Sequence, residues 1–264
     1  MTTLTAAGRR LRSTPRRVGV SMALPVVAVL VWWFASLDNT SPFFPPLKSI
    51  LAAFADLWLF DRVGSDVVPS LVRMFAGYGI AVVVGIGVGV VLGRLPMVLR
   101  AVNPALQFLR ALPATALVPV SIVLLGIGDA PKIVLIAFVS LFPILLNTID
   151  GVRNVDPVLE DVTRSFRFTR TQRVLQVQLP AAAPQILAGM RVALTVAFVL
   201  MVVTELVAAT HGIGYVTLQA QQSFQVPQMW AGMLLLGILG VLINGAFVIV
   251  ERRLLRWYTQ DQEN

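Results

Sequence analysis

The chain has no cysteine and a single histidine, His211. Disulfides, thiolate catalysis and cysteine metal sites are therefore excluded, and one histidine cannot build a multi-histidine metal cluster. Charged residues make up only 13% of the 264 residues, whereas soluble domains usually carry about 25%. Because 57% of the residues are hydrophobic and the mean hydropathy is +0.81, the chain has too little polar surface for a water-facing globule. Aromatic residues are scarce at 8%, so the apolar mass is aliphatic, as lipid-facing helices require.

The net charge of +8 does not indicate nucleic-acid binding. The arginines stand in a few patches at the ends of apolar runs, and no continuous basic stripe with interleaved aromatic residues is present. Positive charge in this arrangement is typical of a signal for membrane topology.

The apolar runs predict an all-α membrane protein with about six transmembrane helices, since about 20 residues cross the hydrocarbon core. The predicted spans cover residues 18–37, 67–93, 104–125, 132–149, 186–209 and 229–250. For the first run a signal peptide is the alternative, but the run is longer than an h-region and no small-x-small cleavage site follows it. Residues 43–60 are too polar to span and predict a helix lying at the outer surface.

The placement of the basic residues predicts the orientation. Counting Arg110 and Arg191 as inner, all but four of the 21 Lys and Arg residues fall on the cytoplasmic side, as the positive-inside rule requires. The four outer ones are Lys48, Arg62, Arg73 and Lys132. Residues 1–17 and 258–264 are then cytoplasmic tails that flank a transmembrane permease domain at 18–257.

Two of the predicted spans carry further patterns. In the second, small residues recur at every fourth position and predict a helix-packing face, formed by Gly77, Ala81, Gly85, Gly89 and Gly93. The third span is interrupted by Pro113 and Pro119. Prolines inside a span need neighbouring helices or water to satisfy the freed carbonyls, so this span is predicted to line the interior of the bundle.

The long hydrophilic segment, residues 150–183, predicts two short helices that project from the membrane. Asp156-Pro157 has the form of an N-cap followed by proline at the first helical position. Thr169 to Gln172 has the Thr-x-x-Gln form of a capping box and opens a second short helix, predicted to end near Leu179-Pro180.

This segment resembles the EAA loop of ABC importer permeases. Asp161 stands for the glutamate of that pattern, Val162 and Thr163 for its two alanines, and Arg167 for its glycine. Val177, Leu179 and Pro180 stand for the closing Ile, Leu and Pro. The spacing is kept, but Arg167 is a departure, because glycine permits a positive φ that arginine does not favour.

Other segments are similar to the nitrate/sulfonate/taurine branch of these permeases, namely residues 109–119, 126–128, 142–148, 151–157, 212–215 and 251–257. The resemblance covers most of residues 43–257. It implies the type I ABC importer permease fold, with cytoplasmic coupling helices that dock on an ATPase. The implied coupling residues are Glu160, Asp161, Val162, Thr163, Arg164, Ser165, Phe166, Arg167, Val177, Leu179 and Pro180.

The resemblance also implies partners: two copies of an ABC ATPase, a second permease copy in a homodimer or heterodimer, and an extracytoplasmic binding protein that delivers a small anionic solute. The implied location is the lipid bilayer of a bacterial inner membrane. No phosphate-cradling Gly-x-x-x-x-Gly-Lys-Ser/Thr motif occurs in the chain, so ATP and Mg are expected on the separate ATPase. The chain itself is expected to be no enzyme and to carry no cofactor.

Residues of the translocation pathway are predicted at Pro113, Pro119, Glu205, Gly212 and Gly214. Glu205 lies inside the fifth span, where a carboxylate is by default functional or paired within the bundle, and both roles stay open. Arg73 either pairs with such a group or extends outward to water. Asn103 and Asn147 are interpreted as helix caps, and His211 as a solvated loop residue.

Two alternatives belong to other functional classes. A secondary transporter or channel without an ATPase would be expected to show internal repeats, and none is visible in the sequence. A membrane-embedded enzyme would need His, Asp or Glu clustered at the bilayer face, whereas the acids here are scattered.

Overall fold

The computed structural model describes residues 15–36, 43–59 and 62–256. These ranges contain helices and connecting turns without any strand. The two predicted tails lie almost entirely outside them.

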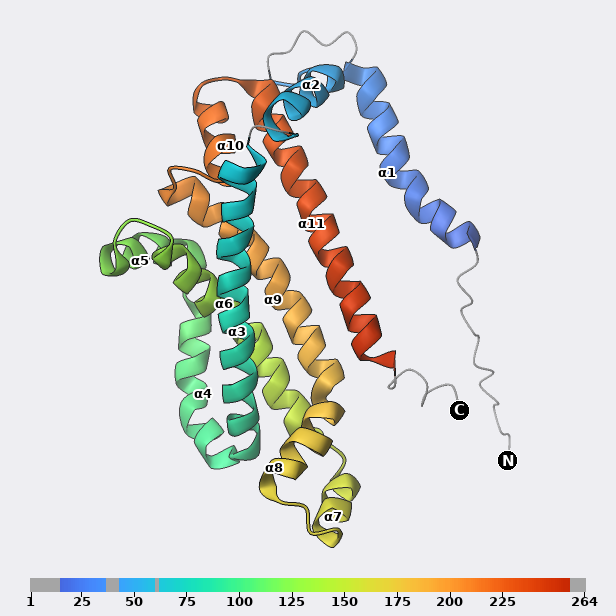
Figure 1. Ribbon diagram of the computed structural model, residues 1–264, viewed down its shortest axis with the longest axis vertical. Coiled ribbons are helices and arrows are strands. Elements are labelled where there is room, and N and C mark those ends of the chain that lie inside the picture. The colour runs from blue at the N-terminus through green and yellow to red at the C-terminus, as the bar shows by residue number, and fades with distance from the viewer. Residues whose placement is uncertain (1–14, 37–42, 60–61, 257–264) are drawn as a thin grey trace.

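The helices follow one another along the described part of the chain as an all-α bundle (Figure 1). Their bounds are α1 (Pro15–Ser36), α2 (Leu47–Trp58), the π-helical turn η1 (Val63–Val67), α3 (Val68–Arg94), α4 (Pro96–Ala111), the 3₁₀ turn η2 (Ala114–Ala116), α5 (Leu117–Leu125), α6 (Ala130–Arg153), α7 (Pro157–Ser165), α8 (Arg170–Gln172), the π-helical turn η3 (Arg173–Gln178), α9 (Leu179–Ala208), α10 (Ile213–Gln222) and α11 (Val226–Leu254).

Among the described residues, four helical segments are long and apolar enough to cross a membrane: 63–94, 130–153, 170–207 and 226–254. Taken as one span, the bent pair of α4 with η2 and α5 is also long and apolar enough, and would be the fifth. Helix α1 has 22 residues, about 33 Å at 1.5 Å per residue, and is long enough to be the sixth. The fold class is that of a multi-pass, all-α membrane protein.

The centre of the bundle is formed by α3, α6 and α9, which pack side by side (Figure 1). Their shared core includes Met74, Ile136, Ile144, Ala197 and Met201, all of them buried. Helix α11 packs beside α2, α10 and α9, and α2 lies across one end of the bundle. That placement of α2 agrees with the prediction of a surface helix at residues 43–60.

The ridge of small residues on α3 lies against α6. A Cβ on Gly77 would lie 2.8 Å from the carbonyl oxygen of Ile133, and one on Gly89 would lie 2.6 Å from the Cβ of Thr148. Gly85 and Gly93 meet Ile144 and Val152 in the same way, and Ala81 is buried. The absence of side chains at these positions lets the two helices approach closely.

The third span differs from its prediction at its start. It begins at Pro96 rather than Pro104, directly after α3 ends, and it bends by 77° between residues 96–111 and 114–125. The bend lies at Leu112, which is extended at φ −65° and ψ 128° because a residue before proline is driven away from the helical region. Pro119 causes no bend, since it lies in the first turn of α5, where its missing N–H would have no helical partner.

This correction moves Arg110 away from the end of the bundle. Counting from Pro96 at 1.5 Å per residue, Arg110 lies about 21 Å along α4. The orientation count had placed it near the start of the span, whereas the structure places it in the last turn of α4, beside the bend.

The second loop helix was predicted to end near Pro180, and this prediction is wrong. Residues 170–207 form one continuous helical segment. The π-helical turn η3 ends at Gln178, two residues before Pro180, and η1 likewise ends at Val67, two residues before Pro69. The wider turns accommodate a proline ring that would otherwise clash with the preceding carbonyl, so the helix continues through it.

Candidate functional site

The two ends of the bundle carry different polar features, named here the α10 end and the α7 end. At the α10 end, Glu205 of α9 is 1% exposed. Its carboxylate accepts hydrogen bonds from the Ser70 hydroxyl at 2.5 Å, the Gly214 N–H at 2.9 Å and Arg73 Nη1 at 3.1 Å. A buried charge with this many donors is fully compensated.

Arg73 extends the same network to α6. Its Nε lies 2.6 Å from Asp129 Oδ1, and the Nζ of Lys132 lies 3.7 Å from the same oxygen. On the other side, Asp66 Oδ1 accepts the N–H of Gly212 at 2.8 Å. We call Asp66, Arg73, Asp129, Lys132 and Glu205 the charge cluster. It joins η1, α3, α6, α9 and the start of α10.

The charge cluster decides between the alternatives that the sequence left open for Arg73. Arg73 is 2% exposed and pairs within the bundle, rather than extending to water. A Cβ at Gly212 would lie 2.5 Å from the carboxylate carbon of Glu205, and one at Gly214 would lie 2.8 Å from its Cβ. The two glycines therefore let the turn before α10 close over the carboxylate, and the geometry favours the anchoring role for Glu205.

Sequence reasoning missed Asp66, Ser70 and Asp129. A signal for the first two was present, because Asp66, Ser70 and Arg73 stand at positions i, i+4 and i+7 and so share a helix face. Their partners on α9 and α10 are more than 130 residues away along the chain. His211 is exposed in the neighbouring loop, where its Nδ1 lies 2.9 Å from the Thr210 hydroxyl.

At the α7 end, the capped loop forms as its local sequence predicts. The Asp156 carboxylate accepts the Val158 N–H at 2.8 Å, and the capping box between Thr169 and Gln172 is present in both directions. Glu160 accepts a hydrogen bond from Gln178 Nε2 at 3.0 Å, which joins α7 to η3. The predictions of both helix starts are confirmed.

Arg167 adopts the conformation that a glycine would favour. Its φ is +53°, and its N–H donates to the Arg164 carbonyl at 3.0 Å while the Phe168 N–H donates to the Thr163 carbonyl at 3.0 Å. This pair of bonds is the Schellman motif that ends many helices at a glycine. A non-glycine residue in the left-handed region costs about 1–2 kcal/mol, so the turn is kept here in spite of its residue.

The surface around this turn is apolar and exposed. Phe166 is 73% exposed and Val158 65% exposed. Leu159 and Val162 are exposed on α7, and Leu175 is exposed in η3. We call these five residues the α7 surface. Arg164 stands next to it and pairs locally with Glu160 at 3.8 Å and Asp161 at 3.7 Å. Ser165 is also exposed, Thr163 is buried, and Val177, Leu179 and Pro180 are half-buried at the start of the fifth span.

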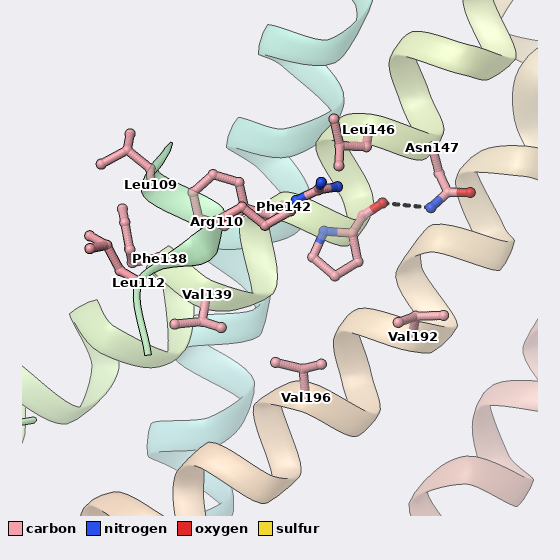
Figure 2. Close-up of a pocket in the computed structure, with 11 residues that line it drawn as sticks. Leu109, Arg110, Leu112, Phe138, Val139, Phe142, Leu146, Asn147, Val192 and Val196 are labelled. Atoms are coloured by element: carbon pink, nitrogen blue, oxygen red, sulfur yellow. Dashed lines mark hydrogen bonds between the residues drawn. The ribbon is translucent and has the colours of Figure 1, made fainter. Parts of the chain in front are cut away.

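Between the two ends, a cavity of about 370 Å³ lies beside the bend of the third span (Figure 2). Three segments line the cavity. The bend contributes Leu109, Arg110 and Leu112, α6 contributes Phe138, Val139, Phe142, Pro143, Leu146 and Asn147, and α9 contributes Val192 and Val196. Asn147 does not cap α6, as had been predicted, because its Nδ2 donates to the Pro143 carbonyl at 2.8 Å within the helix and its Oδ1 accepts from Gln185 at 3.0 Å. Pro113 adjoins this cavity in the chain.

A family of transport proteins matches this chain over residues 81–256, described as the binding-protein-dependent transport system inner membrane component. The chain belongs to this family. It is a transport permease rather than an enzyme, and the family description and its ABC transporter relatives imply work with an ABC ATPase and a binding protein.

Several curated permeases are similar over 73% or more of their length. A protein of Bacillus subtilis named as the aliphatic sulfonates transport permease SsuC is 32% identical over 238 residues, which are 89% of this chain and 86% of that protein. The taurine transport system permease TauC of Escherichia coli is 30% identical over 258 residues, or 94% and 92% of the two chains. The bicarbonate transport system permease CmpB of Synechococcus elongatus is 30% identical over 203 residues, or 74% and 73%.

The fold of this permease is also found in a solved structure. An inward-facing conformation of the MetNI methionine ABC transporter has a TM-score of 0.64 with 22% sequence identity, covering 72% of this chain and 94% of the other.

Proposed function

We propose that this permease forms the membrane pathway of an ATP-driven importer for a small anion, a sulfonate in the first place. The relatives named above carry out transport of aliphatic sulfonates, taurine and bicarbonate, solutes that bear an anionic group. Solute is delivered by a binding protein at the α10 end, and ATP and Mg are bound by the ATPase at the α7 end.

The α7 surface is the observation that carries the coupling role. Exposed apolar patches on a rigid, capped element mark a surface for another protein. The element is continuous with the transmembrane bundle, because Gln178 joins α7 to the helix that becomes α9. Rigid-body motion of a bound ATPase would therefore pass into α9 and on to α6.

The same arrangement supports an orientation with the α7 end in the cytoplasm. Arg94, Arg100 and Arg153 lie at the ends of α3 and α6 and the start of α4, on the side of the α7 loop. Lys and Arg in short loops favour the cytoplasmic side. The inner membrane of a bacterium is the location that fits the family, with both termini inside.

Two ATPases and two permeases form the complete importer in this proposal. A single copy contributes four or five spans and α1, which are few to enclose an alternating pathway, so a second permease copy is expected. Either a homodimer or a heterodimer satisfies this requirement.

Copurification of the tagged permease with its ATPase tests the proposal. Phe166→Asp places a charge in the α7 surface, where the side chain is 73% exposed, and should abolish copurification and transport. Phe224→Asp is the matched control, since Phe224 is 80% exposed in the turn between α10 and α11, and it should leave copurification intact. Equal retention of ATPase by both variants would contradict the coupling role of α7.

A further inference from the structure

The cavity beside the bend of the third span is lined by one cation, Arg110. Arg110 lies about 21 Å along α4 from its start. Ionisable residues inside spanning segments are rare and mark substrate pathways or partners within the bundle. The second explanation can be examined directly from the contacts of Arg110.

No carboxylate of the described residues lies within ion-pair distance of Arg110, and its side chain makes no hydrogen bond within these ranges. This differs from Arg73, which has Glu205 and Asp129, and from Arg191, which lies 3.8 Å from Glu251. The one amide beside it in the cavity, Asn147, already binds Pro143 and Gln185. Among the residues that the structure describes, Arg110 therefore has no ion-pair partner, and its side chain is exposed beside the cavity.

The backbone at the cavity is irregular as well. Leu112 is extended, and the helix bends by 77° around it. Non-helical backbone at membrane depth occurs where it is buried in protein or lines a water-filled cavity. The bend is a feature of the backbone, and the cation without a described partner is a feature of the side chains. Both indicate that water or a polar solute enters the cavity.

The size and lining of the cavity restrict what can bind. Its volume of about 370 Å³ is at the low end for ligand sites, which range over about 300–1,000 Å³. Apart from Arg110 and Asn147 the wall is hydrocarbon, with Phe138 and Phe142 on one side and Val192 and Val196 on the other (Figure 2). A small anion with a short apolar part fits this combination, because guanidinium binds oxyanions through two parallel N–H donors.

We propose that this cavity is a binding site within the membrane for the transported anion, with the Arg110 guanidinium as its charged contact. The assignment of the transported anion rests on the proposed function, whereas anion binding at this cavity is a property of this chain alone. The site lies between the delivery end and the α7 end, so an anion held there is part-way across.

Cysteine labelling tests anion binding without any partner. Because the chain has no native cysteine, Val196→Cys supplies a single thiol in the cavity wall. The thiol is treated with 2-sulfonatoethyl methanethiosulfonate, an anion, and with the trimethylammonioethyl reagent, a cation. Adding Arg110→Gln should lower the ratio of anionic to cationic labelling rates by about tenfold or more, because one unit of local charge is removed.

Two further variants serve as controls. Arg100→Gln removes an exposed charge from the same helix, where Arg100 Nε donates to the Pro96 carbonyl, and should leave the ratio unchanged. Arg110→Lys keeps the charge and should keep the ratio. If Arg110→Gln does not fold, Val196→Cys with Arg110 intact is labelled in the presence of taurine or ethanesulfonate instead. A bound anion should then protect the thiol from both reagents. An unchanged ratio, absent protection, or a thiol that neither reagent reaches would each overturn the proposal.

Uptake of radiolabelled taurine or ethanesulfonate into proteoliposomes with the complete importer tests the transport role. Arg110→Gln should reduce uptake by at least about tenfold, while ATP hydrolysis stimulated by the binding protein continues. Uptake at the wild-type rate would overturn the site. Failure of the wild-type complex to couple ATP to uptake would instead overturn the proposed function, and the labelling result would still decide the anion site.

Discussion

Glu205 and Glu160 are held in opposite ways at the two ends of the bundle. The carboxylate of Glu205 is buried, and its donors Ser70 and Arg73 are 135 and 132 residues away along the chain. Glu160 is half-exposed and binds Arg164, four residues on, and Gln178, 18 residues on. The α10 end is therefore fixed by contacts between distant elements, whereas the α7 end is held by local contacts and leaves its surface open to a partner.

Removal of each glutamate is the strongest way to break this comparison. Glu205→Ala leaves Arg73, Ser70 and the Gly214 N–H without their buried acceptor. We expect the free energy of unfolding to fall by about 3–5 kcal/mol, as for other broken buried pairs. Glu160→Ala should cost less than about 1 kcal/mol, because its pair with Arg164 is largely exposed. Denaturant unfolding of the purified protein in detergent micelles measures both.

A double variant separates the lost charge pair from a general loss of packing. Glu205→Met with Arg73→Met removes both charges and should be more stable than Glu205→Ala alone, since the single variant leaves Arg73 buried with Asp129 as its one remaining carboxylate among the described residues. Equal losses for Glu205→Ala and Glu160→Ala would mean that the two ends do not differ in this respect.

The ridge between α3 and α6 connects the two ends, and it allows a matched test on one helix. Gly89→Ala would place its Cβ 2.6 Å from the Cβ of Thr148 and force α3 and α6 apart. The free energy of unfolding should therefore fall by about 1–3 kcal/mol. A Cβ on Gly87 would meet no atom within 4 Å, so Gly87→Ala should be neutral or stabilising by up to about 1 kcal/mol. Thermal unfolding of the two variants checks this difference, and a milder effect at Gly89 than at Gly87 would contradict the packing described.

The smallest expected effect sharpens the account of the α7 end. Arg167→Gly relieves a φ of +53° at the end of α7 and should stabilise this turn by about 0.5–1.5 kcal/mol, less the entropy that glycine adds to the unfolded chain. Hydrogen exchange at the Phe168 N–H, which donates to Thr163, measures the turn itself. The control Arg170→Gly should weaken α8, and faster exchange in Arg167→Gly than in the wild type would rule out strain at Arg167.

Much of the α7 end could be predicted because its interactions are local. The N-cap at Asp156 and the capping box from Thr169 to Gln172 involve residues two or three apart, so a short stretch of sequence contains both partners. Arg167 shows the limit of this reasoning. Its side chain disfavours a positive φ, yet the two hydrogen bonds of the turn hold it there.

The spans themselves follow from hydropathy, but their breaks do not. Pro113 and Pro180 carry the same local signal, and only Pro113 bends its helix, because a π-helical turn precedes Pro180. Whether a wider turn forms depends on how the flanking segments pack, which no local pattern contains.

Hydropathy and the capping residues were enough to determine a multi-pass helical protein with a capped helical loop, since each depends on residues that are neighbours in the chain. The tertiary structure alone decided which charges are compensated. Arg73 and Arg110 look alike in the sequence, each an arginine inside an apolar run. Folding brings Glu205 and Asp129 to the buried Arg73. The exposed Arg110 has no carboxylate partner among the described residues and lies beside apolar walls and an occupied amide. The physical reason is that charge compensation depends on distance in space, and these partners come from other helices.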